Sequence, residues 1–163
     1  MTAEGSARYA RRDGTYVLRL EGAIRYTLGH ALDSFLDRIF AAGDFKDIVI
    51  DLSAAESIDS TGLGLLAKVA NFLRRRDGRK PLLFSPRADI NTLLGSMCLD
   101  QVFVVCDSAP AETAESIPAT DPSAAQLAQT VLAAHRLLCE LSADNRAQFQ
   151  TVVDAFQREL RQP

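Results

Sequence analysis

The chain has 163 residues, 47% of them apolar and 24% charged, and it carries a formal net charge of −3. This composition is typical of a globular protein with its own core, and it excludes collagen-like, mucin-like and wholly disordered chains. The near-neutral charge argues against a nucleic-acid partner. Because the first residues lack the apolar run of a signal peptide and no stretch supplies the ~20 apolar residues of a membrane span, we expect a cytoplasmic protein without direct membrane insertion.

Strand and helix signals alternate over the first two thirds of the chain. Short apolar or β-branched runs predict strands at residues 16–20, with a hairpin partner at 7–11, and at 48–50, 82–84 and 102–105. Apolar residues at helical spacing predict helices at 28–39 and 63–73, each closed by a glycine, and another around 90–94. This alternation predicts an α/β domain in which helices pack on a mixed sheet.

The chain changes character after residue 107. The stretch from Asp107 to Ala125 is rich in Ala, Ser, Thr, Glu and Pro and poor in bulky apolar residues, which is typical of a linker. Basic and acidic residues balance over residues 1–107, so the net charge of −3 lies entirely in the remainder. We therefore predict a domain at 1–107, a linker at 108–121 and a further segment at 122–163.

That last segment predicts an α-helical hairpin. Its apolar residues recur in steps of three and four, at 127, 131, 134, 138 and 141 and again at 149, 153, 156 and 160. Asp121 followed by Pro122 predicts the start of the first helix, and residues 142–145 predict the turn before the second. Two interpretations stay open: the helices pack on the same core, or their apolar seam docks on a partner or on a second copy of the chain.

The most informative stretch runs from residue 47 to residue 69. A buried strand ends at Asp51, a loop follows, and Ser60 lies at or near the N-cap of the next helix, where free N–H groups and the helix dipole favour an oxygen or an anion. Ser60 is therefore either a capping serine or the site of a phosphorylation switch. Gly62 and Gly64 permit close approach of another protein, or tight packing of the loop on the helix.

Residues 58–64, Ile-Asp-Ser-Thr-Gly-Leu-Gly, resemble the signature of STAS domains of the anti-sigma factor antagonist type. The strand at 48–52, the arginine-rich helix end at 74–78 and the segment at 99–103 resemble the same family, so the likeness covers residues 5–106. It implies a five-element sheet with helices packed on one side, and no catalysis.

In that family a dedicated serine kinase phosphorylates the serine of this motif, and a PP2C-type phosphatase removes the phosphate. The phosphorylation state decides whether the antagonist captures an anti-sigma factor and so frees a sigma factor. The resemblance implies that Ser60 is the phosphoacceptor, with Thr61 as the alternative. The partner surface that it implies comprises Arg25, Asp59, Ser60, Thr61, Gly62, Leu63 and Gly64.

One stretch departs from the family pattern. Where the family has a Gly-Glu-Ile/Leu-Asp sequence after the second strand, this chain has Gly22-Ala23-Ile24-Arg25. Its helical extension makes the chain similar to antagonists of the HsbA type, which pair with one response-regulator phosphatase/kinase and with the flagellar anti-sigma factor. The alternative function is that of a non-catalytic STAS subunit in a membrane transport or scaffold assembly.

Other chemistries find little support in the sequence. A serine hydrolase needs a base beside its nucleophile, and the two histidines, His30 and His135, lie in separate segments and are expected to be packing or surface residues. The basic cluster at 74–80 is expected to be a solvated helix end. The three cysteines have no metal-ligand spacing, and no glycine-rich nucleotide motif occurs, so we expect neither a metal nor another cofactor.

Overall fold

The computed structural model describes residues 4–106 and 115–162. The sheet-forming part contains β1 (Ser6–Arg12), β2 (Thr15–Ile24), α1 (Tyr26–Ala42), β3 (Asp47–Asp51), β4 (Ala55–Ile58), α2 (Ser60–Asp77), β5 (Leu82–Phe84), α3 (Ala88–Ser96), the 3-10 helix η1 (Leu99–Gln101) and β6 (Val104–Cys106). The later part contains β7 (Glu115–Ser116), α4 (Ala124–Leu141) and α5 (Ala143–Arg161). The predicted α/β class with a C-terminal helical hairpin is confirmed.

A mixed seven-stranded sheet organises the first part of the fold. Its strand order is β6-β5-β3-β2-β1-β7, and β4 pairs with the end of β2. The predicted β1–β2 hairpin is antiparallel, whereas β3, β5 and β6 continue the sheet in parallel. Gly22, with a φ of +74°, marks the register shift at which β2 pairs with β4. This conformation is open to glycine and costly for other residues.

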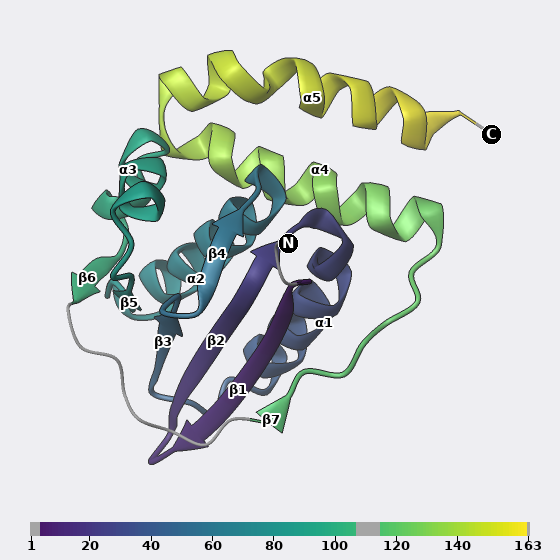
Figure 1. Cartoon of the computed structure of the whole chain (residues 1–163). Coiled ribbons are helices and arrows are strands. Elements are labelled where there is room, and N and C mark those ends of the chain that lie inside the picture. The colour runs from purple at the N-terminus through teal and green to yellow at the C-terminus, as the bar shows by residue number, and fades with distance from the viewer. Residues whose placement is uncertain (1–3, 107–114, 163) are drawn as a thin grey trace.

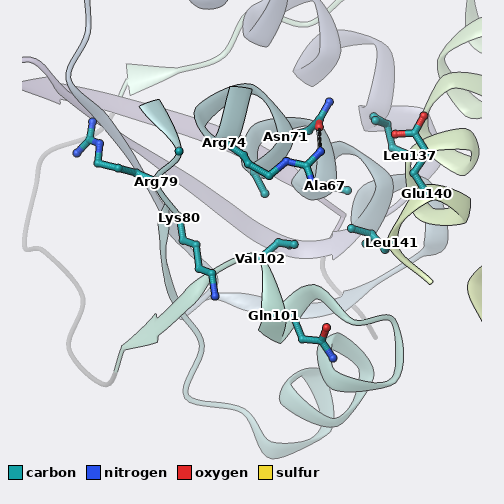
Figure 2. Close-up of a pocket in the computed structure, with 12 residues that line it drawn as sticks. Ala67, Asn71, Arg74, Arg79, Lys80, Gln101, Val102, Leu137, Glu140 and Leu141 are labelled. Atoms are coloured by element: carbon teal, nitrogen blue, oxygen red, sulfur yellow. Dashed lines mark hydrogen bonds between the residues drawn. The ribbon is translucent and has the colours of Figure 1, made fainter. Parts of the chain in front are cut away.

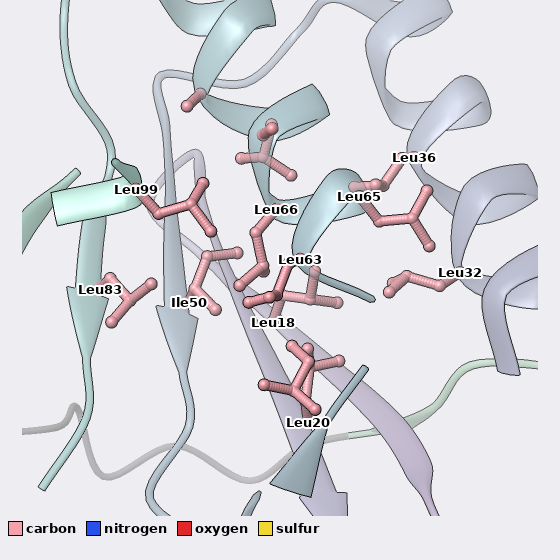
Figure 3. Packing of buried hydrophobic residues seen from close by; sticks show 14 of the residues in the cluster. Leu18, Leu20, Leu32, Leu36, Ile50, Leu63, Leu65, Leu66, Leu83 and Leu99 are labelled. Atoms are coloured by element: carbon pink, nitrogen blue, oxygen red, sulfur yellow. The ribbon is translucent and has the colours of Figure 1, made fainter. Parts of the chain in front are cut away.

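Helices α1 and α2 cover one face of the sheet (Figure 1). Alternate residues of β2, Leu18 and Leu20, point toward these helices together with Ile50 of β3. Leu63 and Leu66 of α2 meet them in the same cluster (Figure 3), and each of these five side chains is at most 2% exposed. Side chains two residues apart on the strand and three residues apart on the helix therefore pack against each other in one core.

The hairpin helices begin where their own side chains cap them. The Ser123 hydroxyl accepts a hydrogen bond from the Gln126 N–H, and the Gln126 side chain bonds back to Ser123 in a capping box. The predicted start at Asp121 and Pro122 is therefore wrong by two residues. The turn predicted at 142–145 does cap the second helix, because the Ser142 hydroxyl accepts the Asn145 N–H, but it is shorter than predicted: Ser142 alone separates α4 from α5.

The hairpin packs on the chain's own domain. Helix α4 lies across α1 and α2, and α5 packs on the outer side of α4 (Figure 1). Leu132 and Leu138 of α4 join the core cluster, and Phe149 and Val153 of α5 close the seam between the two hairpin helices. Of the two interpretations of the apolar seam, the structure therefore shows packing on the same core.

Three local features differ from the expectations. Strands β4 and β7 were not expected, and with them the sheet has seven strands where the family resemblance implies five elements. Part of the expected linker, residues 115–117, pairs with β1, while residues 107–114 lie outside the described part of the chain. Val102 and Phe103 were expected in a strand, but they follow η1 in a turn that places Phe103 in the core. Among the described helices none is long and apolar enough to cross a bilayer.

Candidate functional site

The N-termini of α1 and α2 meet at Asp59. This residue is the N-cap of α2, and its Oδ1 accepts the Gly62 N–H at 2.9 Å. Its other oxygen, Oδ2, accepts the N–H of Tyr26, the first residue of α1, at 2.7 Å. One carboxylate therefore satisfies a free donor of each helix, and the positive ends of two helix dipoles gather around the motif.

Ser60 is the first residue of α2 and is partly buried. Its predicted position at the helix start is confirmed, but Asp59 and not Ser60 is the cap. The Ser60 Oγ lies 2.8 Å from Nε2 of His135, which belongs to α4. The other ring nitrogen, Nδ1, is 2.7 Å from the backbone oxygen of Val131. Since a carbonyl oxygen only accepts, Nδ1 donates to it, and in the tautomer that carries its proton on Nδ1 the Nε2 atom accepts the Ser60 O–H.

His135 is therefore more than the packing residue that was expected. It is 4% exposed, and its ring meets that of Phe149 edge-on with 5.4 Å between the centroids. His30, by contrast, lies beside Thr120, with 2.8 Å between its Nδ1 and the Thr120 hydroxyl. The Ser60–His135 pair joins positions 75 residues apart, so no local pattern pointed to it. Only the apolar stripe that includes Ala134 indicated which face of α4 would be buried.

Most of the remaining motif is buried under its own chain. Thr61 is 3% exposed and Leu63 is 1% exposed, within the core. A Cβ at Gly62 would lie 2.8 Å from Cγ1 of Ile58, so this glycine allows the end of β4 to pack on the helix. A Cβ at Gly64 would overlap the backbone oxygen of Ala134 in α4. The close approach that Gly64 permits is thus occupied by the chain's own hairpin.

Arg25 lies beside these residues at the surface. It precedes α1 as its exposed N-cap residue, and the Asp59 N–H donates to the oxygen of the neighbouring Ile24 at 2.9 Å. The fold therefore brings residues 22–25 and 59–64 together, as the family resemblance implies. Their role as a partner surface stays a prediction.

A cavity of about 350 Å³ lies at the opposite end of α2 (Figure 2). Its rim carries Arg74, Arg79 and Lys80, and its apolar wall includes Leu137 and Leu141 of α4. Arg79 donates to the carboxylates of Asp47 and Asp77, and Gly78 ends the helix in the left-handed conformation. The expected helix-end role of the basic cluster agrees with these contacts. Neither Ser60 nor His135 lines this cavity.

Two further observations concern metals and thiols. Within residues 4–106 and 115–162, no group of three or more His, Cys, Asp or Glu side chains could hold a metal ion. Burial raises the pKa of the Cys139 thiol on α4 above its ordinary value. That thiol is therefore protonated near neutral pH and a weak nucleophile.

Comparison with known proteins gives these observations a context. The family model for the STAS domain matches residues 6–112, which ends before α4 and α5. The NMR structure of the protein TM1081 is 23% identical, with a TM-score of 0.55, and the match covers 61% of this chain and 79% of that one. No curated protein matches the chain.

Two further solved structures carry informative descriptions. The unphosphorylated anti-sigma factor antagonist SpoIIAA, a Bacillus protein, is 16% identical with a TM-score of 0.55, over 64% of this chain and 90% of that one. An anti-sigma factor antagonist from Mycobacterium paratuberculosis is 25% identical with a TM-score of 0.53, over 66% of this chain and 92% of that one. Since the family model matches well over half of the sequence and the folds agree, the chain belongs to the STAS domain family.

Proposed function

We propose that the chain is an anti-sigma factor antagonist that acts by binding a partner protein and not by catalysis. The likeness to the antagonist from Mycobacterium paratuberculosis supports this function, as does the STAS fold that the chain shares with SpoIIAA. The observation that carries the proposal is the hydroxyl of Ser60 at the first turn of α2, directly after the cap Asp59. The partner is an anti-sigma factor, whose capture releases a sigma factor.

Ser60 is the phosphoacceptor in this proposal. A phosphate adds about −1.5 to −2 charges, and the N-termini of α1 and α2 favour an anion at this position. Thr61 is the alternative acceptor, but its side chain is buried whereas Ser60 is only partly so. A serine kinase and a PP2C-type phosphatase, or one response-regulator protein with both activities, would set the phosphorylation state in the cytoplasm.

The energy needed for such a switch is modest. Each 1.4 kcal/mol changes an affinity about tenfold. A phosphate without a partner in a docked interface costs at least that much through repulsion and desolvation. A difference of two or three kcal/mol in binding free energy between the phosphoforms would change a partner's affinity by about 30- to 150-fold. That is enough to decide which protein is bound without any change of fold.

The Ser60–His135 pair invites comparison with a nucleophile and its base. In a hydrolase triad, a carboxylate orients the histidine and a cavity admits the substrate. Here the backbone oxygen of Val131 orients the ring, and both oxygens of the nearby Asp59 are bonded to helix N–H groups. The pair joins two packed helices, and the cavity of Figure 2 lies at the other end of α2. These features favour a structural contact over a catalytic one.

Affinity capture with both phosphoforms tests the proposal. Protein recovered from its native cells is analysed by phosphosite mapping, and each form is then used to capture partners from lysate. We expect phosphate on Ser60, none after Ser60→Ala, and an unchanged pattern in the control Ser53→Ala, which alters an exposed serine. Phosphate elsewhere with Ser60 unmodified contradicts the switch. Capture of transporter subunits in place of an anti-sigma factor would support the alternative assembly, for which the altered residues 22–25 are the argument.

A further inference from the structure

We propose that the α4–α5 hairpin is an autoinhibitory cover, which in its docked position withholds Ser60 and the first turns of α2 from kinase and partner. This inference rests on the proposed function of Ser60, and it assigns a role to the part of the chain that the STAS family model does not match. The kinase and the partner then gain access only when the hairpin leaves α2.

The first step of the argument concerns the Ser60 hydroxyl. Its oxygen lies 2.8 Å from Nε2 of His135, within hydrogen-bond distance. A serine that receives a phosphoryl group must instead present its oxygen in line with the γ-phosphate of the nucleotide and give its proton to the kinase. Helix α4 lies against this oxygen through the His135 ring and leaves Ser60 only partly exposed. Docked Ser60 is therefore unsuited to phosphorylation.

The second step concerns the backbone of α2. Because Gly64 has no side chain, the Ala134 carbonyl of α4 rests directly against the helix, where even a methyl group would not fit. At the start of α1, a Cβ on Gly29 would lie 3.4 Å from Cγ2 of Thr130, so α4 also lies close to this helix. The hairpin thus covers Gly64 and the side of Ser60 that faces α4, whereas Arg25 stays exposed beside them. A partner that contacts the covered side of α2 cannot bind there while the hairpin is docked.

The third step concerns how the hairpin is attached. Its buried contacts include the polar groups of His135 and Asn145, and the Asn145 side chain donates to the backbone oxygen of Met97 at 2.9 Å. The chain reaches α4 through residues 118–123, which are largely exposed and form no helix or strand. Phe149 and Val153 hold α5 on α4, so both helices can leave as one unit. The partner's apparent affinity is then its affinity for the open form multiplied by the fraction of molecules that are open.

A cysteine in place of Ser60 allows the accessibility of this position to be measured directly. In Ser60→Cys, the rate at which a soluble thiol reagent labels the new side chain is followed by peptide mass spectrometry, which separates it from Cys98, Cys106 and Cys139. The same rate is measured with Ala134→Arg added, which places a cation in the contact with Gly64. The matched control is Ala133→Arg, because Ala133 neighbours Ala134 on the same helix but is exposed.

We expect Ala134→Arg to accelerate labelling about tenfold or more, which corresponds to a shift of at least 1.4 kcal/mol in hairpin opening. Ala133→Arg should leave the rate within about twofold of Ser60→Cys alone. Amide exchange should show lost protection in α4 while β2 and β3 stay protected. Asn145→Ala, which breaks the bond to Met97, gives a second opened form should Ala134→Arg unfold the domain.

Three results would overturn the proposal. The first is labelling in Ser60→Cys alone that is as fast as in the opened variants. The second is unchanged labelling in a variant whose α4 amides have lost protection. The third is a hairpin that stays protected in both Ala134→Arg and Asn145→Ala, because the proposal requires it to detach.

Phosphorylation separates this inference from the function on which it rests. When lysate is the source of kinase, faster modification of Ser60 in Ala134→Arg than in Ala133→Arg supports the cover. Equal rates overturn the cover but leave Ser60 as the acceptor. If Ser60 takes no phosphate even in Ala134→Arg, whose labelling shows an exposed site, the proposed phosphorylation fails while the cover stands.

Discussion

The sheet domain and the helical hairpin are held by different kinds of contact. In the domain, Leu18 and Ile50 from the strands interlock with Leu66 from α2, in a core of large apolar side chains. The hairpin adds fully buried Leu138 and the less deeply buried Leu132, Phe149 and Val153 to the same cluster, and its closest approach to α2 is made by the small Ala134. Large side chains that lock several elements at once resist local opening.

Buried polar groups sharpen the contrast. Among the described residues, six polar or charged side chains are buried, and three of them, Thr130, His135 and Asn145, belong to the hairpin. Water can satisfy such groups when the interface opens, whereas apolar surface gains nothing from exposure. The difference leads us to expect that the hairpin separates more readily than the sheet domain unfolds.

The largest expected effect comes from leucine truncation on the two sides of the comparison. Leu66→Ala should lower the free energy of unfolding of the domain by about 3 kcal/mol, because it leaves a cavity beneath α2. Leu138→Ala removes an equally buried side chain, yet it should mainly raise amide exchange in α4 and α5. Urea unfolding together with amide exchange checks both variants. If Leu138→Ala destabilises β2 and β3 as strongly as Leu66→Ala does, the two regions form one cooperative unit.

The next effect concerns the polar anchor of the hairpin. Asn145→Ala removes hydrogen bonds to the backbone oxygens of Met97 and Leu138. Leaving buried acceptors without a donor should ease hairpin opening by about 2 kcal/mol, measured as faster amide exchange across α5. Gln148→Ala, on the exposed face of α5, is the control and should change nothing. If Asn145→Ala and Gln148→Ala accelerate amide exchange in α5 equally, the Asn145 hydrogen bonds do not hold the hairpin in place.

A smaller effect is expected where the two domain helices begin. Asp59→Ala removes the cap that bonds the N–H groups of Gly62 and Tyr26, and should cost about 1 kcal/mol in the urea unfolding of the domain. Asp100→Ala changes an exposed aspartate of η1 and serves as the control. Exchange should rise in the first turns of α1 and α2. A rise confined to the hairpin would show that the cap acts through α4.

The smallest effect lies between α1 and α2. Burial alone would lower the pKa of Lys68, but the hydrogen bonds that its ammonium donates to Asp33 and Asp37 outweigh burial and raise the pKa above its ordinary 10.5. The ion pair therefore stabilises the fold below pH 10.5, and this contribution disappears as the pH rises through the folded pKa. Its size should be under about 1 kcal/mol.

Lys68→Met isolates that contribution. The difference in unfolding free energy between the natural chain and Lys68→Met should be constant at neutral pH and shrink above pH 10.5. A difference that grows with pH would contradict the assignment. The hairpin should be insensitive to this variant, because Lys68 bonds α1 and not α4.

The sequence alone indicated much of the domain. The predicted strand pair at 7–11 and 16–20 and the helix stripe from residue 63 were confirmed, because apolar periods of two and near four are local properties of β2 and α2. The motif at 58–64 likewise placed Ser60 at a helix start. Strand β4 escaped notice, because two of its four residues are exposed and it carries no apolar alternation.

Tertiary structure decided what covers the motif. The stripe on α4 predicted an apolar face but not its neighbour, since periodicity describes one helix and carries no information on the surface it meets. Only the folded chain brings His135 to Ser60 and the Ala134 carbonyl to Gly64. Hydrogen bonds and backbone contacts of this kind depend on the relative placement of two elements far apart in sequence. Local sequence therefore determines that the motif lies at the start of α2. Only the packing of α4 on α2 determines that part of the motif is buried.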